Sequence, residues 1–254
     1  MRTLSVRTVR GVAAWLCCSA GLLVAQEAPR PKPYTLTADL GYVSVSGNQQ
    51  LTTLSVGDKF TYKTGSWLFT QQFNAVYSEA SGSANAEFYR VAGRADLTIS
   101  KHFTLFSVLT WDRNRFGGIK NKFEEQVGAN WRAVASTADS LSFDVGGGFV
   151  QQGNLDGSQL DFAAGRLAAA YKHKFSDRAY VAHTDEFTSN LQDTGDWRAN
   201  SETAIVAPLS KALSIKLSYL IRYQARPPFR PGVTPAERFK NTDYVFTTGI
   251  QVTF

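Results

Sequence analysis

The sequence is short of the residue types that most often carry cross-links, metal ions or membrane-spanning helices. Its 254 residues include only two cysteines and three histidines, so a metal centre has few sulfur or nitrogen ligands to draw on. Repeated apolar runs of about 20 residues, which a helical membrane protein needs, are missing, and the mean hydropathy is -0.21. Disorder is excluded as well, because 43% of the residues are hydrophobic.

The first 25 residues have the pattern of a secretory signal peptide. Three arginines precede an uncharged stretch from Gly11 to Ala25. A basic region, a short apolar region and a small residue at the end are the three parts of such a peptide, and we expect cleavage after Ala25. The pattern leaves two alternatives open, which are a membrane anchor and a lipid attached to Cys17 or Cys18.

Removal of residues 1–25 changes what the charge of the chain implies. Both cysteines are lost, and the mature chain keeps 27 − 3 = 24 basic residues against 21 acidic ones, a net charge of 24 − 21 = +3. The exported protein then has no disulfide, and so small an excess gives little support for nucleic-acid binding. Residues 26–34 are a proline-rich lead segment, and residues 35–254 are predicted to form one domain.

After the lead segment, apolar and polar residues alternate with the period of two that is typical of β-strands. In the first such segment Leu36 and Leu40 share one face and Asp39 lies on the other. Twelve alternating segments follow one another, and none of the eight prolines interrupts one. The pattern does not settle which way the eighth segment (Ala163–Tyr171) and the ninth (Ala179–Phe187) face.

The connections between the segments alternate in length. Short turns are expected near Lys63–Ser66, Ser100–His102, Ala135–Asp139, Phe175–Arg178 and Pro208–Lys211, and the connections at the other end near Gly47–Gln50 (the one short member), Glu79–Glu87, Arg113–Asn121, Gln152–Gln159, Asn190–Asp196 and Arg226–Asn241. An even number of strands, with short turns at one end and longer loops at the other, predicts an all-β fold: a transmembrane, antiparallel, up-and-down β-barrel of about 12 strands.

A secreted β-sandwich or a soluble barrel would also have alternating strands, but two features disfavour it. Aromatic residues mark the ends of the segments, as in the interfacial girdles of membrane barrels; they are Trp67, Tyr77, Trp111, Trp131, Trp197, Tyr223 and Tyr244. The opposite face of the segments carries many charges, which would be costly to bury in a dry core. We therefore predict that the aromatic face meets lipid and the charged face lines a lumen.

The second hairpin allows a prediction of strand register. If it is centred on Thr64-Gly65, Tyr62 pairs with Trp67. The two polar exceptions on the apolar face, Asp58 and Gln71, then lie opposite each other and can interact directly.

Several short motifs follow one another along the chain in a characteristic order. They are Ser46-Gly47-Asn48, Glu87-Phe88-Tyr89-Arg90, Trp111-Asp112-Arg113-Asn114-Arg115-Phe116-Gly117-Gly118, Leu217-Ser218-Tyr219-Leu220-Ile221-Arg222-Tyr223 followed by Pro227-Pro228, and Thr242-Asp243-Tyr244. In these motifs the chain, over residues 36–254, resembles the salt-induced outer-membrane protein family, a bacterial barrel family without an assigned activity. The resemblance implies a barrel in the outer membrane of a Gram-negative bacterium with a structural or stress-related role. The loop with Phe229–Phe239 is longer than the family pattern.

The histidines do not form a recognisable catalytic or metal-binding pattern. His102, His173 and His183 lie in or near the predicted short turns, whereas a hydrolase needs a nucleophile and a base side by side. Ser176 near His173 is the candidate dyad, but serine is common in turns for conformational reasons. We predict a non-enzymatic protein without metal or cofactor, with an outer-membrane hydrolase as the minor alternative.

The inward-facing charges are the main candidates for function. They are Asp39, Lys59, Arg90, Arg94, Asp96, Glu124, Arg132, Asp144, Arg166, Glu202, Lys216 and Arg222. One interpretation is a structural or envelope-stress barrel whose lumen is largely closed by paired charges. The alternative is a narrow channel with a mild preference for anions, since lysine and arginine rings favour anions.

Two further groups of residues predict contacts with partners. Basic residues on the long-loop rim are candidates for binding lipopolysaccharide phosphates; they are Arg113, Arg115, Lys120, Lys122, Arg226 and Arg230. The last strand resembles the signal that outer-membrane proteins present to the barrel-assembly machinery, through Tyr244, Phe246, Ile250, Val252 and Phe254. The loops lack aromatic platforms for bases, so we expect no nucleic-acid partner.

Overall fold

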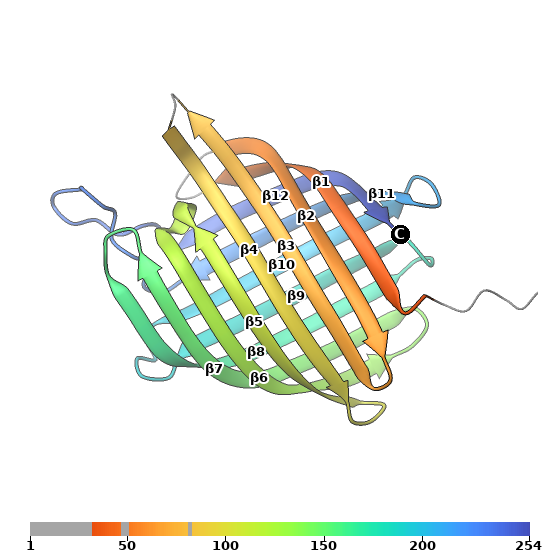
Figure 1. Ribbon diagram of the computed structural model, residues 1–254. Helices are drawn as coiled ribbons and strands as arrows, with labels where there is room; N and C mark the ends of the chain where they lie inside the picture. Colours follow the sequence, from red (N-terminus) through yellow and green to blue (C-terminus); the bar gives the residue numbers. More distant parts are fainter. Residues whose placement is uncertain (1–31, 47–50, 81–82) are drawn as a thin grey trace, which may run out of the picture. The chain divides into compact units, whose positions relative to one another are not determined.

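The computed structural model describes residues 32–46, 51–80 and 83–254. Twelve antiparallel strands form a closed barrel in the compact unit Pro33–Phe254 (Figure 1). The strands are β1 (Tyr34–Ser46), β2 (Leu51–Thr64), β3 (Trp67–Ala80), β4 (Ser83–Thr98), β5 (Phe103–Asn114), β6 (Ile119–Ala135), β7 (Asp139–Asn154), β8 (Gln159–Lys174), β9 (Tyr180–Asn190), β10 (Trp197–Pro208), β11 (Leu213–Gln224) and β12 (Thr242–Thr253). The predicted fold class and strand number are confirmed.

The barrel closes where the first strand meets the last. Each strand pairs with its neighbours in sequence, and β1 pairs with β12 from Thr37↔Thr253 to Ser46↔Tyr244. Closure gives every strand a hydrogen-bonding neighbour on both sides, which is what a β-structure needs in order to cross a lipid bilayer. The short 3₁₀ helix η1 (Arg115–Gly117) joins β5 to β6, and no helix among the described residues is long and apolar enough to cross a membrane.

The register of the strands places the apolar face outside. Leu105, Val127 and Phe149 are exposed on the outer wall, as expected for side chains that meet lipid. The register also settles the two strands whose facing the sequence left open. Leu167 of β8 lies beside Val145 of β7 and Phe187 of β9, so these residues and those of the same parity point outward.

Aromatic side chains cluster near both ends of the outer wall. At the loop end, Trp197 stacks on Tyr223 with ring centres 4.6 Å apart. At the short-turn end, Trp67 stacks on Phe69 and Trp131 on Phe143, both at 5.9 Å. Two aromatic belts separated by aliphatic residues match the two interfaces of a membrane.

The predicted register of the second hairpin is wrong by two residues. The structure pairs Thr64 with Trp67, and Asp58 lies opposite Phe73 instead of Gln71. The turn is therefore the two-residue segment Gly65–Ser66, in which Gly65 has a φ of 55°. Two-residue hairpins favour a positive φ at this position because it matches the twist of the strands, and this preference fixes the turn.

Several connections at the other end are shorter than predicted. The strands continue through most of Glu79–Glu87 and into both ends of Arg113–Asn121 and Gln152–Gln159 as hydrogen-bonded hairpins. The predicted connection Gly47–Gln50, with part of the motif Ser46-Gly47-Asn48, lies outside the described residues, as do the signal peptide and most of the lead segment.

The connection between β11 and β12 is long, as predicted, and it folds back on the barrel. Pro228 and Phe239 are buried, and the backbone N–H of Phe239 donates to Pro228 O at 3.0 Å. The N–H of Phe229 donates to the Asp156 carboxylate in the β7–β8 turn at 3.2 Å. We call residues 225–241 the capping loop, because Pro227 and Lys240 near its two ends line a cavity in the lumen.

Candidate functional site in the lumen

All twelve predicted lumen charges lie at inward positions of their strands. Further inward charges were missed, among them Asp112, Lys122, Lys172, Glu186, Arg198 and Asp243. Strand parity was the signal that could have found Asp112, Lys122, Arg198 and Asp243. For β8 and β9 this parity was unreadable, because small residues occupy both faces of β8.

Asp144 of β7 is the centre of a network of charges in the middle of the barrel. Its Oδ2 accepts hydrogen bonds from Arg94 Nη1 at 2.9 Å and Arg166 Nη1 at 3.0 Å, and its Oδ1 accepts from Asn130 Nδ2 at 2.6 Å. Arg166 also donates from Nη2 to Glu186 at 2.7 Å. Charge-assisted hydrogen bonds of this length are the strong ones, so the network ties β4, β6, β7, β8 and β9 together.

Arg94 reaches Asp144 from three strands away because the inner wall between them is flat. Gly128 and Gly146 in this part of the wall have no side chains that would stand in the way. The guanidinium lies 4.2 Å above the centre of the Phe106 ring, and that ring lies on Gly128 and Gly146. A Cβ at Gly128 would come within 2.6 Å of Phe106 Cζ, so the ring fits only against glycine. Gly128 of β6 and Gly146 of β7 thus let the Phe106 ring lie close to the wall, with the cation–π contact of Arg94 on top.

A second network lies nearer the loop end. Asp112 of β5 is buried and forms ion pairs with Arg90 at 3.4 Å and Lys122 at 3.1 Å. Lys122 also pairs with Glu124 at 2.6 Å. Every charge here has an opposite neighbour, which a buried carboxylate requires.

A cavity of about 80 Å³ lies beside this second network, between β4–β6 and β10–β12. Two of its arginines differ from those above: Arg198 and Arg222 form no ion pair among the described residues. The guanidinium nitrogens of Arg198 are all buried without a hydrogen-bond partner. The guanidinium carbon of Arg222 lies 4.4 Å from the centre of the Phe88 ring. The charged lining residues are Arg90, Lys122, Arg198, Arg222, Lys240, Asp112 and Asp243.

The short-turn half of the lumen is more open. Lys59 and Thr184 point inward and are nevertheless exposed. Lys216 pairs loosely with Asp39, at 3.6 Å, and both side chains keep more than a quarter of their surface exposed. Inward side chains with this much accessible surface line a space that water can enter.

The predicted rim residues lie in different settings. Arg113 and Arg115 both pair with Glu87, at 2.7 and 3.3 Å. Lys120 is exposed. Lys122, expected on the rim, points into the lumen because it shares the parity of Glu124.

The other two rim residues lie in the capping loop. Arg226 pairs with Asp193 of the β9–β10 turn, and the guanidinium of Arg230 lies 5.2 Å from the centre of the Phe239 ring. Contact of the rim with lipopolysaccharide stays a prediction, as does the assembly role of β12. Tyr244, Phe246, Ile250 and Val252 lie on the outward face of this strand, and Phe254 follows its end.

The histidines make local contacts. His173 Nδ1 lies 2.8 Å from Asp139, and Ser176 accepts the N–H of Ala179 within its turn, so this serine has a structural role there. His183, on the outer wall, lies between Thr203, 2.8 Å away, and Asp185, 3.1 Å away. Within the described residues no group of three potential metal ligands is found.

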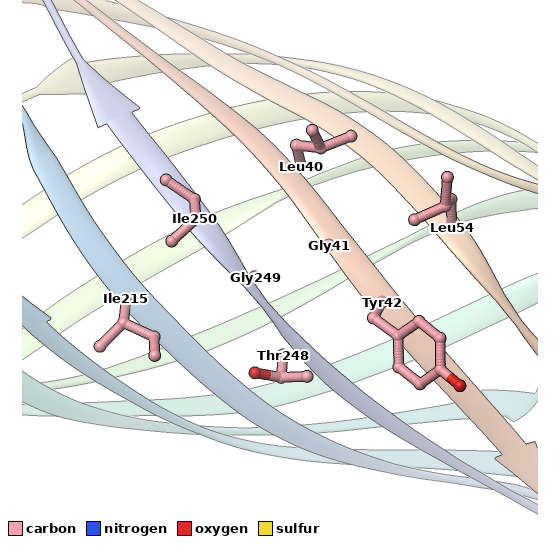
Figure 2. A pocket seen from close by; sticks show the side chains of 8 residues that line it. All are labelled: Leu40, Gly41, Tyr42, Leu54, Ile215, Thr248, Gly249 and Ile250. Carbon is pink, nitrogen blue, oxygen red and sulfur yellow. The ribbon is translucent and has the colours of Figure 1, made fainter.

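A groove on the outer wall lies at the β1–β12 seam (Figure 2). Gly41 and Gly249 face each other across the seam, and a Cβ on Gly249 would come within 2.5 Å of Leu40 O. The side chains around the groove are Leu40, Tyr42, Leu54, Ile215, Thr248 and Ile250. The groove is a feature of the lipid-facing wall and carries no charged group.

Comparison with known proteins identifies the fold. A family model described as "Protein of unknown function, DUF481" matches residues 38–254, and no curated protein matches significantly. Among solved structures, the NanC porin is 11% identical with a TM-score of 0.55, covering 85% of this chain and 98% of that one. An outer membrane channel from Pseudomonas putida F1 is 8% identical with a TM-score of 0.54, covering 88% and 96%.

The translocator domain of the autotransporter NalP from Neisseria meningitidis is 12% identical with a TM-score of 0.52, covering 89% of this chain and 90% of that one. At these identities the shared property is the barrel fold, which is that of outer-membrane proteins.

Proposed function

Because the chain belongs to the DUF481 family, whose function is unknown, and folds as a porin-like outer-membrane barrel, we propose that it is a narrow channel for small anions. The lumen is lined by charges and accessible to water in its short-turn half. A role as a salt-induced protein is a separate prediction from the sequence resemblance, and the channel does not depend on it.

The observation that carries this proposal is the surplus of unpaired cations in the lumen. Lys59, Arg198 and Arg222 point inward without an ion pair among the described residues. Among the five predicted inward acids, only Glu202 likewise has no ion pair with a described residue. Rings of unneutralised lysine and arginine raise the local concentration of anions and favour their passage.

A structural barrel with a closed lumen is the second candidate, and one observation favours it. Near the loop end, the inward side chains of β5–β9 are tightly packed. They include Thr110, Gln126, Gln152, Asn154 and Thr188, all buried. Filling of this kind closes small barrels, so passage in this protein would have to use the side of the lumen next to β10–β12.

Planar bilayers separate the two candidates. The mature protein should show discrete conductance steps, and in a KCl gradient the reversal potential should have the sign of chloride preference. Lys59→Gln should reduce that preference without lowering stability, because Lys59 forms no ion pair with any residue that the structure describes. A protein that inserts but stays silent at high voltage would contradict the channel and support the structural role.

A further inference from the structure

Arg198 and Arg222 are neighbours on adjacent strands that both point into the lumen. Arg198 is paired with Gln224, and Arg222 is paired with Asn200. The two arginines are thus diagonal neighbours, a distance that long side chains can bridge. No ion pair or hydrogen bond joins either guanidinium to a described carboxylate, although Asp243 lies beside Arg222 in the β11–β12 ladder.

Such an arrangement is energetically unfavourable by itself. A buried guanidinium without hydrogen-bond partners loses the hydration of a full charge, and Nε, Nη1 and Nη2 of Arg198 are all in this state. A second cation on the neighbouring strand adds repulsion. The ring of Phe162, 5.6 Å from the guanidinium carbon of Arg198, gives only a weak compensating contact.

The cavity beside the two arginines has the charge that an anion requires. Five of its lining residues are cations and two are acids. Of the acids, Asp112 is already engaged with Arg90 and Lys122. The capping loop covers the cavity through Pro227 and Lys240.

We propose that Arg198 and Arg222 form a binding site for an oxyanion, a carboxylate or a phosphate group, in this lumen cavity. Guanidinium groups hold the two oxygens of such a group with paired hydrogen bonds, which a spherical halide cannot accept. Rotation of the long Arg198 side chain from Phe162 toward the cavity brings its unpartnered N–H groups to the anion. A volume of about 80 Å³ suits the charged group of a solute, with the remainder of the solute extending along the lumen.

The site deepens the proposed function and rests on it for its physiological meaning. In a channel, an oxyanion held at this level would be a solute in transit, because conduction needs a site that binds and releases. Occupied by phosphate, the same site would obstruct the flow of chloride.

Calorimetric titration of the mature protein, folded in detergent micelles, tests the site without requiring conduction. Sodium phosphate and sodium acetate are the two probes, with sodium chloride as the comparison salt. Arg198→Gln removes the unpartnered charge and should weaken binding of the preferred probe about 10- to 100-fold, the usual weight of a charged hydrogen-bonding group. Lys59→Gln makes the same change of charge in the short-turn half and should alter binding less than about twofold, since solvent screens distant charges.

The outcomes separate the site from the channel. If phosphate or acetate binds and Arg198→Gln weakens this binding, the result supports the site even when no conductance is measured in planar bilayers. The absence of conductance would then contradict only the proposed channel. The stronger of the two probes identifies the chemistry of the natural solute. Equal weak binding of all three salts, or equal loss in Arg198→Gln and Lys59→Gln, would overturn the site while leaving the channel untouched.

Discussion

Two pairs of arginines on the lumen wall have the same facing and opposite surroundings. Arg94 and Arg166 converge on Asp144, and Arg166 also holds Glu186. Arg198 and Arg222 form no ion pair with a carboxylate in the part of the chain that the structure describes. Alternation along the strands predicts that Arg94, Arg166 and Arg222 point inward and could also have found Arg198, but only the fold decides which of them have partners. A cation with its partners supports the wall, and a cation without them is available to a solute.

The largest effect is expected from breaking the paired side of this comparison. Arg166→Gln leaves Asp144 with one arginine fewer and Glu186 without its ion pair. Loss of one partner from a largely buried pair costs about 3 kcal/mol of unfolding free energy. Urea unfolding of the folded barrel, followed by tryptophan fluorescence, measures this value.

Arg198→Gln is the matched control, because it makes the same chemical change at an arginine without a carboxylate. It should leave the unfolding free energy within about 0.5 kcal/mol or raise it, since no partner is abandoned. An equal loss of unfolding free energy in the two variants would show that Arg198 also stabilises the barrel, and the proposed difference between the two pairs of arginines would be wrong.

The difference between the arginine pairs also marks the limit of sequence-based prediction here. The twelve strands and the inward parity of Arg94 and Asp144 are local properties, readable from alternation. Their contact joins residues 50 positions apart and depends on a ring lying across two glycines. The register of the second hairpin failed for a related reason, because a shift of the turn at Gly65 moves every pair in the hairpin.

The next effect comes from the flat wall that lets Arg94 reach its partner. Gly128→Ala places a methyl group 2.3 Å from Val145 O and 2.6 Å from Phe106 Cζ. The ring must move and Arg94 moves with it, at a cost of about 1–3 kcal/mol, as for other overpacked sites. Gly93→Ala is the control, because a Cβ there meets nothing within 4 Å. Urea midpoints that are equal for the two variants would mean that the ring does not depend on the glycine.

The smallest effect concerns the cover of the unpaired arginines. Burial raises the pKa of Asp156, but hydrogen bonds from Ser158 and from the N–H of Phe229 lower it more, so the net pKa lies below its ordinary value. A carboxylate with a depressed pKa stabilises the docked loop above its ordinary pKa and loses that contribution as the pH falls through the depressed value. Acid should therefore loosen the contact between the capping loop and the β7–β8 turn while the barrel stays folded.

Hydrogen exchange at Phe229 and Arg230 across this acidic range measures the release. Asp156→Asn keeps the size of the side chain and removes its charge, so exchange in this variant should be faster at neutral pH and nearly independent of pH. If the capping loop of the variant still loosened in acid as the wild-type loop does, a titratable group other than Asp156 would be responsible. Because the loop lines the cavity, a wild-type protein with its loop released should also bind phosphate more weakly, whereas Lys59→Gln should not loosen the loop at any pH. Loosening of the capping loop should thus affect only the unpaired arginines, and the paired network around Asp144 should keep its stability across this pH range.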